Sequence, residues 1–167
     1  MLDFIMDRRS IRRYTDKPVP EEMVEAMVRA AMYAPSAGNH QPWHFIVVTD
    51  RNLLEEVPGF HPHSAMVPGA AGMLVVCGDP ARQRHSEMWV QDCSAATQNL
   101  LLAAAAQGLG AVWLGVYPRE DRMSGCRDLF RIPQEIVPFS MVPFGWPAEH
   151  PSRPERFDAS RIHRDRW

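Results

Sequence analysis

Apolar residues along this chain follow helical spacing in some segments and form short continuous runs in others. Between Pro18 and Pro35 they recur every three or four positions, which predicts one helix with a proline near each end. The residues expected on its buried face are small or flexible: Met23, Ala26, Met27, Ala30, Ala31 and Ala34. A second helix is predicted over 89–107, ended by Gly108. Because it is apolar nearly all round, we expect it to lie centrally or against a second subunit.

The continuous runs predict strands over 44–49, 73–78, 111–116 and 136–144. In the last of these, Pro138 and Pro143 lack a ladder N–H, so we expect that strand to be irregular or at an edge. Two further helices are predicted over 2–9 and 119–130. Residues 51–71 carry several prolines and glycines, which predicts an irregular, mobile surface segment.

This order of elements predicts an α+β fold in which helices pack on a sheet, with residues 1–167 as one domain. The tail from Pro147 onward is rich in proline and arginine, with Phe157, Ile162 and Trp167 as isolated apolar residues. Such a tail cannot fold alone, and we expect it to need a surface to lie on.

Composition excludes several classes of protein. With 46% hydrophobic and 23% charged residues the chain is an ordinary globular one, and its net charge of -2 argues against nucleic-acid binding. The longest fully apolar run, over 100–106, is far shorter than the ~20 residues that span a bilayer. The N-terminus lacks the long apolar region of a signal peptide, so we expect a cytoplasmic protein. The three cysteines form no C-x-x-C pair, which argues against a disulfide framework or a thiolate zinc site.

Basic residues gather near the two ends of the chain, and no charged residue lies between Cys93 and Pro118. The two groups are Arg8, Arg9, Arg12, Arg13 and Lys17, then Arg153, Arg156, Arg161, Arg164 and Arg166. Arginine presents a rigid donor fork that matches phosphate or carboxylate oxygens two at a time. The first group therefore either holds a particular anion or is a solvated basic segment.

Three motifs give the chain a resemblance to the nitroreductase family of flavin-dependent oxidoreductases. Residues 8–12 resemble the family's R-x-S-x-[RK] signature, and residues 35–45 resemble its P-S-x-x-N-x-Q-P-W-x-F loop. The strand at 113–115 resembles the one that passes the flavin ring. The resemblance covers essentially the whole chain and implies a central, mainly antiparallel sheet flanked by helices, in an intertwined homodimer. It also implies that the tail from about residue 147 packs on the partner subunit.

The resemblance implies where FMN binds. Arg8 and Arg12 would lie near the phosphate or the polar ring edge, Arg9 and Ser10 would complete that wall, and Arg153 and Arg156 would close over the phosphate. Arg13 and Lys17 are interpreted as surface charge.

The resemblance also implies contacts to the rest of the cofactor. Pro35, Ser36 and Asn39 would reach it from the partner subunit, which puts FMN at the subunit interface. Gln41 either bonds the ring edge or holds the loop. Leu114 would bring its amide or side chain to the ring, and Gly115 is either the close approach to the ring or a packing glycine.

Other candidate sites are weaker. His61 and His63 have the spacing of a metal pair but no carboxylate nearby, so we expect no metal. No G-x-S-x-G, G-x-G-x-x-G or P-loop motif occurs. No side chain need act as an acid or base, because a flavin carries the redox chemistry.

The expected function is therefore hydride transfer from NADH or NADPH through FMN to nitroaromatics, quinones or related small acceptors, by a ping-pong mechanism. A flavin-binding carrier or sensor without turnover, and a purely structural dimer with surface arginines, remain as alternatives.

Overall fold

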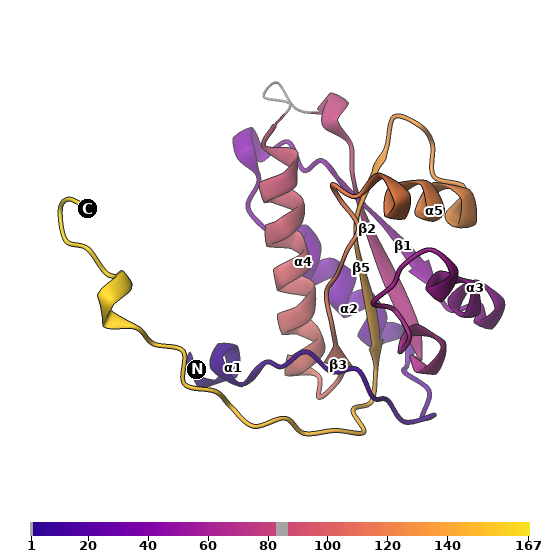
Figure 1. Ribbon diagram of the computed structural model, residues 1–167, viewed down its shortest axis with the longest axis horizontal. Helices are drawn as coiled ribbons and strands as arrows, with labels where there is room; N and C mark the ends of the chain where they lie inside the picture. Colours follow the sequence, from indigo (N-terminus) through magenta and orange to yellow (C-terminus); the bar gives the residue numbers. More distant parts are fainter. Residues whose placement is uncertain (1, 83–86) are drawn as a thin grey trace.

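A sheet with helices on both faces organises the computed structural model, which describes residues 2–82 and 87–167 (Figure 1). Within those residues five strands pair antiparallel, in the order β1-β2-β5-β3, with β4 also pairing with β5. The strands are β1 (Trp43–Val48), β2 (Gly72–Gly78), β3 (Gly110–Ala111), β4 (Leu114–Gly115) and β5 (Val137–Gly145). The predicted α+β class is confirmed.

Strand β5 was predicted to be irregular or at an edge, and it lies inside the sheet, between β2 and the short strands β3 and β4. Its prolines are accommodated by a local irregularity: Val76 pairs with Ser140 but Cys77 pairs with Pro138, so Phe139 has no partner in β2. The Phe139 carbonyl instead accepts hydrogen bonds from the N–H groups of residues 116 and 117. The strand is irregular, as predicted, but it is not at an edge.

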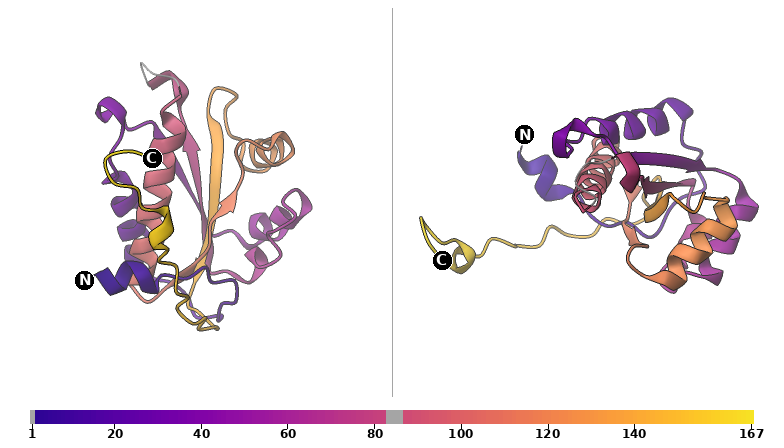
Figure 2. Two further views of the ribbon diagram at one scale, coloured as in Figure 1. Left: turned by 60° about the vertical axis from the view of Figure 1, so that its left-hand side comes forward. Right: turned by 90° about the horizontal axis from the view of Figure 1, so that it is seen from above.

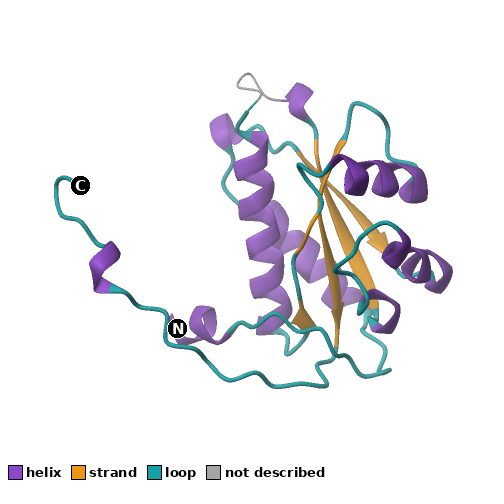
Figure 3. Ribbon diagram, viewed as in Figure 1, coloured by secondary structure: helices purple, strands orange, loops and turns teal. Residues whose placement is uncertain are grey.

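One face of the sheet packs against α2 (Glu21–Met32) and α4 (Trp89–Ala106) (Figures 1 and 3). Burial of α4 is confirmed, with Cys93, Ala96 and Leu100 fully inside. The buried face of α2 is shifted from the predicted one: Met27 and Ala31 are buried, Ala26 is exposed and Val24 takes an inner position. We call this packing the first core.

The other face packs against α3 (Arg51–Glu56) and α5 (Glu120–Phe130), and forms the second core (Figure 2). The prediction of an irregular surface segment over 51–71 is wrong, because Leu54, Val57 and Val67 are fully buried. Two of the three prolines that suggested a loop, Pro58 and Pro68, lie in the first turns of short 3-10 helices, where no N–H is needed. The middle strand β2 is buried along its whole length, since its residues alternate between the two cores.

The two chain ends run together along one side of the body. Helix α1 (Leu2–Asp7) leads into a segment that bridges to β3 at Ser10 and Ala111. From residue 151 the tail is exposed and, apart from a short 3-10 turn, Ala159–Arg161, runs extended away from the sheet (Figures 1 and 2). Phe157 and Trp167 are 75% and 101% exposed, so the surface that the tail needs is not within the described part of this chain.

Candidate functional site

Four of the predicted arginines line one hollow between α1 and the start of the tail. The hollow has a volume of about 250 Å³, and we call it the basic hollow. Its lining residues are Ile5, Met6, Arg8, Arg9, Arg153, Pro154, Glu155, Arg156 and Phe157. The chain's two basic groups therefore meet in space through these four side chains, although Arg8 and Arg9 are more than 140 residues from Arg153 and Arg156 in sequence.

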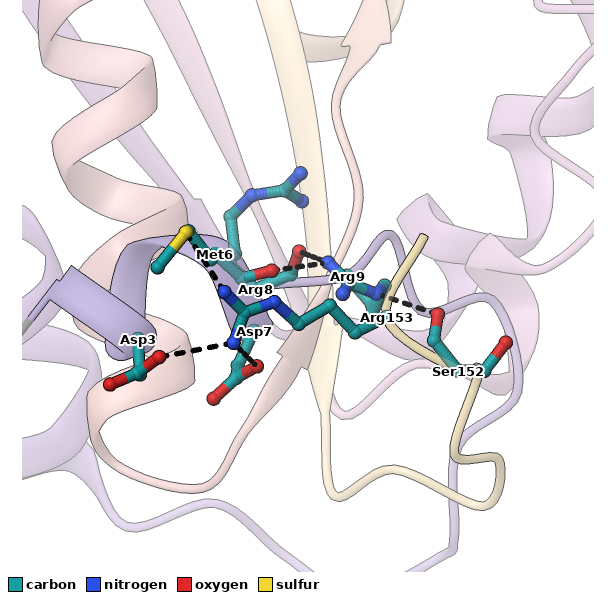
Figure 4. A network of polar contacts seen from close by, with 7 residues as sticks. All are labelled: Asp3, Met6, Asp7, Arg8, Arg9, Ser152 and Arg153. Atoms are coloured by element: carbon teal, nitrogen blue, oxygen red, sulfur yellow. Dashed lines mark hydrogen bonds and ion pairs between the residues drawn. The ribbon is translucent and has the colours of Figure 1, made fainter. Parts of the chain in front are cut away.

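Two of these arginines are tied into the protein (Figure 4). Arg153 Nη1 lies 3.1 Å from an Asp3 carboxylate oxygen and 3.3 Å from one of Asp7. Arg9 donates to the carbonyl oxygens of Met6, at 2.9 Å, and Ser152, at 3.0 Å. These contacts fasten the tail to α1 and so form the wall of the hollow.

The Arg8 guanidinium has no ion-pair partner among the described residues, and Figure 4 draws no contact to it. Burial lowers its pKa, and the nearby charges of Arg156 and Arg9 lower it further. Arg9 Nη2 is also buried without a hydrogen-bond partner among the described residues. Glu155, the hollow's carboxylate, accepts from the backbone N–H groups of Arg156 and Phe157, which lower its pKa. Cations held together in this way favour the binding of an anion.

Two of the predicted site residues in the first motif, Ser10 and Arg12, do not line the hollow. Ser10 lies in the backbone bridge to Ala111, and the Arg12 side chain is exposed. The Glu149 carboxylate accepts from the backbone N–H of Arg12 at 2.6 Å, which fixes the main chain but leaves the guanidinium outside.

The second motif forms a loop that is held by its own polar groups. Ser36 Oγ accepts from the Gln41 N–H at 3.0 Å, and Asn39 Oδ1 accepts from Gln41 Nε2 at 2.9 Å. Asn39 and Gln41 have φ angles of 57° and 49°, a left-handed conformation that these bonds sustain. Pro35, which follows the end of α2 at Met32 and its cap Tyr33, is exposed.

Asp92 anchors that loop, a role that the sequence analysis missed. It is 5% exposed, in the first turn of α4, and its Oδ1 accepts from the Ala37 N–H at 3.1 Å. A single carboxylate in an otherwise apolar helix was the signal that could have identified it, because a buried charge needs hydrogen-bond donors.

The loop and the basic hollow lie at opposite ends of α4 (Figure 1). The loop contacts the first turn of the helix, whereas Arg8 and Arg9 lie beside its last turn, near Ala105 and Leu109. A helix of 18 residues is about 27 Å long. Within one chain, the predicted site residues of the loop therefore lie about 27 Å from those of the basic hollow.

Gly115 occupies an open position on β4. A Cβ built there would meet no described residue within 4 Å other than its chain neighbours, so packing within the chain does not require a glycine. Leu114 is 4% exposed, so its side chain belongs to the second core.

The Gly115 carbonyl accepts from His61 Nε2 at 3.0 Å and from Arg122 Nη1 at 2.7 Å, two contacts that sequence reasoning did not identify. His61 is 2% exposed, and burial lowers its pKa. Among the described residues no group of three or more potential ligands could hold a metal ion, so the His61 and His63 pair has no further ligands there.

Comparison with known proteins gives one family. The sequence model described as "Nitroreductase family" matches residues 5–63 and 61–146, which together span most of the chain and include all three motifs. No helix in the described residues is long and apolar enough to cross a membrane.

Individual relatives agree with that match. The chain is 52% identical over 167 residues to a Methanothermobacter thermautotrophicus protein named "Putative NADH dehydrogenase/NAD(P)H nitroreductase", covering 100% of this chain and 87% of that one. A solved structure of the same name from Parabacteroides distasonis has a TM-score of 0.95 and 41% identity, covering 99% and 98% of the two chains. The FMN-dependent nitroreductase of Clostridium difficile has a TM-score of 0.93 and 25% identity, with 100% of both chains covered.

Proposed function

Because the chain belongs to the nitroreductase family, we propose that it is an FMN-dependent oxidoreductase that takes hydride from NADH or NADPH. It passes the electrons to nitroaromatics, quinones or related small acceptors, and donor and acceptor use the site in turn by a ping-pong mechanism. When bound, the flavin supplies the redox chemistry, and the side chains bind and orient it. Names of relatives that include NAD(P)H and FMN support the donor and the cofactor.

The observation that carries the proposal is the unpaired charge in the basic hollow. Arg8 and Arg156 have no ion-pair partner among the described residues, and Arg9 keeps one buried N–H group without an acceptor. A phosphate dianion would supply acceptor oxygens to all of them and relieve their mutual repulsion. Arg153, already paired with two carboxylates, would hold the tail against α1 and so keep Arg156 in place.

The ring of the cofactor would lie against β4, where Gly115 leaves open space. Ser10 would complete the wall between this strand and the hollow, since it bridges to Ala111 just before β4. Arg12, whose side chain is exposed, would reach the phosphate or the polar ring edge from outside the hollow. Leu114 would contribute its backbone, because its side chain is buried.

Residues at the far end of α4 would complete the site of a second subunit. The loop with Pro35, Ser36, Asn39 and Gln41 is about one helix length from the basic hollow of its own chain. In a homodimer with FMN at the interface, this loop would contact the cofactor held by the partner's arginines. The tail from about residue 147 would then pack on the partner, which accounts for its exposed Phe157, Ile162 and Trp167.

A cytoplasmic location is part of the proposal. It is supported by the free cysteines Cys77, Cys93 and Cys126, all buried as thiols.

The first test is the visible spectrum of the purified protein after addition of FMN, recorded before and after anaerobic NADH and NADPH. We expect flavin bands that bleach with a donor and return when a quinone is added. Bands that no donor bleaches would favour a carrier or sensor. A protein that binds no flavin would contradict the proposal altogether.

Mixing two defective subunits tests whether each site is shared. In a mixture of Arg8→Met and Asn39→Ala chains, each mixed dimer would have one site with both residues intact and one with neither. We expect the mixture to regain FMN binding that neither variant has alone. If both residues act within one chain, mixing will restore nothing.

A further inference from the structure

The backbone carbonyl oxygen of Gly115 accepts hydrogen bonds from two side chains that belong to different segments of the chain. The Gly115 carbonyl accepts from His61, 54 residues earlier, and from Arg122, seven residues later. A carbonyl oxygen has two lone pairs, so these contacts occupy both.

In the contact between His61 and the Gly115 carbonyl, the tautomer of the imidazole ring can be assigned. His61 Nδ1 accepts from the His63 N–H at 3.3 Å, so the ring proton is assigned to Nε2, which donates to Gly115. The ring is held in place by its own segment: the His61 N–H donates to Val57, and the His61 carbonyl accepts from Ser64 Oγ at 2.7 Å. His61 is thus a fixed, neutral donor.

The arginine contact brings a charge. Arg122 comes from the first turns of α5, and its Nε is buried with no partner among the described residues. Leaving a buried N–H group without a partner costs free energy. The hydrogen bond from Nη1 to the Gly115 carbonyl, at 2.7 Å, therefore holds the guanidinium in place.

Strand β4 is short, and Gly115 contributes no side chain to its packing. It has two residues, which pair with Met141 and Ser140 of β5, and one of the two is a glycine with no side chain to pack. Glycine has more backbone freedom than any other residue. The two donors therefore restrain the Gly115 peptide directly, in addition to the packing of Leu114 and the pairing with β5.

We propose that His61 and Arg122 are positioning residues for the flavin ring, because they fix the Gly115 carbonyl and hold β4 in the conformation that meets the ring. The proposal rests on the proposed function. Arg122 has a second effect, since its charge lies beside the strand that faces the ring. Reduction places negative charge on the flavin, and a nearby cation favours the reduced form.

The test compares Arg122→Met with Arg127→Met in the full-length protein. Arg127 is a matched control: it lies on the same helix, is half-buried, also has a buried unpaired Nε, and donates to the carbonyls of residues 134 and 136 instead of Gly115. Arg122→Lys keeps the positive charge and a hydrogen-bond donor. His61→Gln keeps a neutral donor, whereas His61→Leu removes the donor. The readouts are FMN dissociation constant, flavin midpoint potential and melting temperature.

We expect Arg122→Met and His61→Leu to weaken FMN binding roughly tenfold, as the loss of one positioning hydrogen bond would. Arg127→Met should lower the melting temperature without this loss. Arg122→Met should also shift the midpoint potential to a more negative value, and Arg122→Lys should restore it. If the parent protein binds FMN but the Arg122 and Arg127 variants match in affinity and potential, the positioning role is wrong and the proposed function stands. If the parent binds no FMN, the proposed function fails first.

Discussion

The two ends of α4 hold their site residues in opposite ways. At the first turn, the 35–41 loop is closed by its own polar side chains and anchored on the buried carboxylate of Asp92. At the last turn, the basic hollow is made by two chain-terminal segments whose ion pairs are exposed, and Arg8 has no ion-pair partner among the described residues. The loop is held in its conformation without a ligand, whereas the basic hollow keeps positive charge that a bound anion would neutralise. We therefore expect substitutions in the hollow to weaken ligand binding, and substitutions in the loop to lower the free energy of unfolding.

The largest effect is expected from Arg8→Met. Loss of a charged hydrogen bond to phosphate costs about 1.5–3 kcal/mol, or roughly tenfold to a hundredfold in FMN affinity. The free energy of unfolding without FMN should not fall, because Arg8 has no ion-pair partner among the described residues and the neighbouring charges of Arg156 and Arg9 repel it. Arg13→Met, which removes an exposed charge from the same segment, is the control. Titration of flavin fluorescence measures the difference, and equal affinities for the two variants would remove Arg8 from the site.

Asp92→Ala should show the opposite behaviour. It leaves the Ala37 N–H without its acceptor, which costs about 1–3 kcal/mol of stability. Asp92→Asn keeps an acceptor oxygen and should lose less. Urea unfolding of the protein without FMN gives both values. If Asp92→Ala left stability unchanged and weakened only FMN binding, the loop would not be built in advance.

A smaller effect is expected from pH, acting on His61, whose hydrogen bond to the Gly115 carbonyl supports β4. Burial lowers the pKa of His61 below its ordinary 6.5, with Arg122 and His63 acting in the same direction and the Gly115 hydrogen bond against it. The unfolded chain therefore takes up a proton at a higher pH than the folded protein does. The free energy of unfolding should fall as pH drops below about 6.5, until the folded histidine also titrates. His61→Gln should remove this component from an unfolding series between pH 8 and 5. If the two proteins show the same pH profile, His61 is not held neutral.

Sequence patterns predicted the first core better than the second. Helical spacing of apolar residues located α2, and a long segment that is apolar nearly all round and ends at Gly108 located α4; both pack on the sheet in the first core. The same reasoning failed for the 51–71 segment: its prolines and glycines suggested a loop, although Pro58 and Pro68 lie in 3-10 helices whose first residues, Val57 and Val67, are buried in the second core. The central place of β5 was hidden for a similar reason, since the bulge that accommodates Pro138 depends on β2 and cannot be read from β5 alone.

The site shows the same limit. Motifs predicted which residues to examine, and the meeting of Arg8 and Arg9 with Arg153 and Arg156 agrees with the grouping of basic residues at both chain ends. The supporting contacts of Asp92, His61 and Arg122 were not predicted, because each is directed at a backbone group. The lone carboxylate of α4 indicates that Asp92 needs hydrogen-bond donors, but a backbone donor or acceptor has no sequence signature that would identify the partner.

The burial of β2 on both faces raises the question of what sets its register. In a half-exposed strand, a slip by one residue would expose apolar side chains to water and so be disfavoured. In β2 a slip would only exchange one core for the other, since Met73 and Val75 face the second core and Leu74 and Val76 the first. The two ends of the strand supply the missing restraint. A Cβ at Gly72 would lie 2.7 Å from the Phe144 ring, and one at Gly78 would lie 2.2 Å from the Trp89 ring. A slip in either direction would move a side chain into one of those contacts, so the residues that lack a side chain fix the alignment of the sheet.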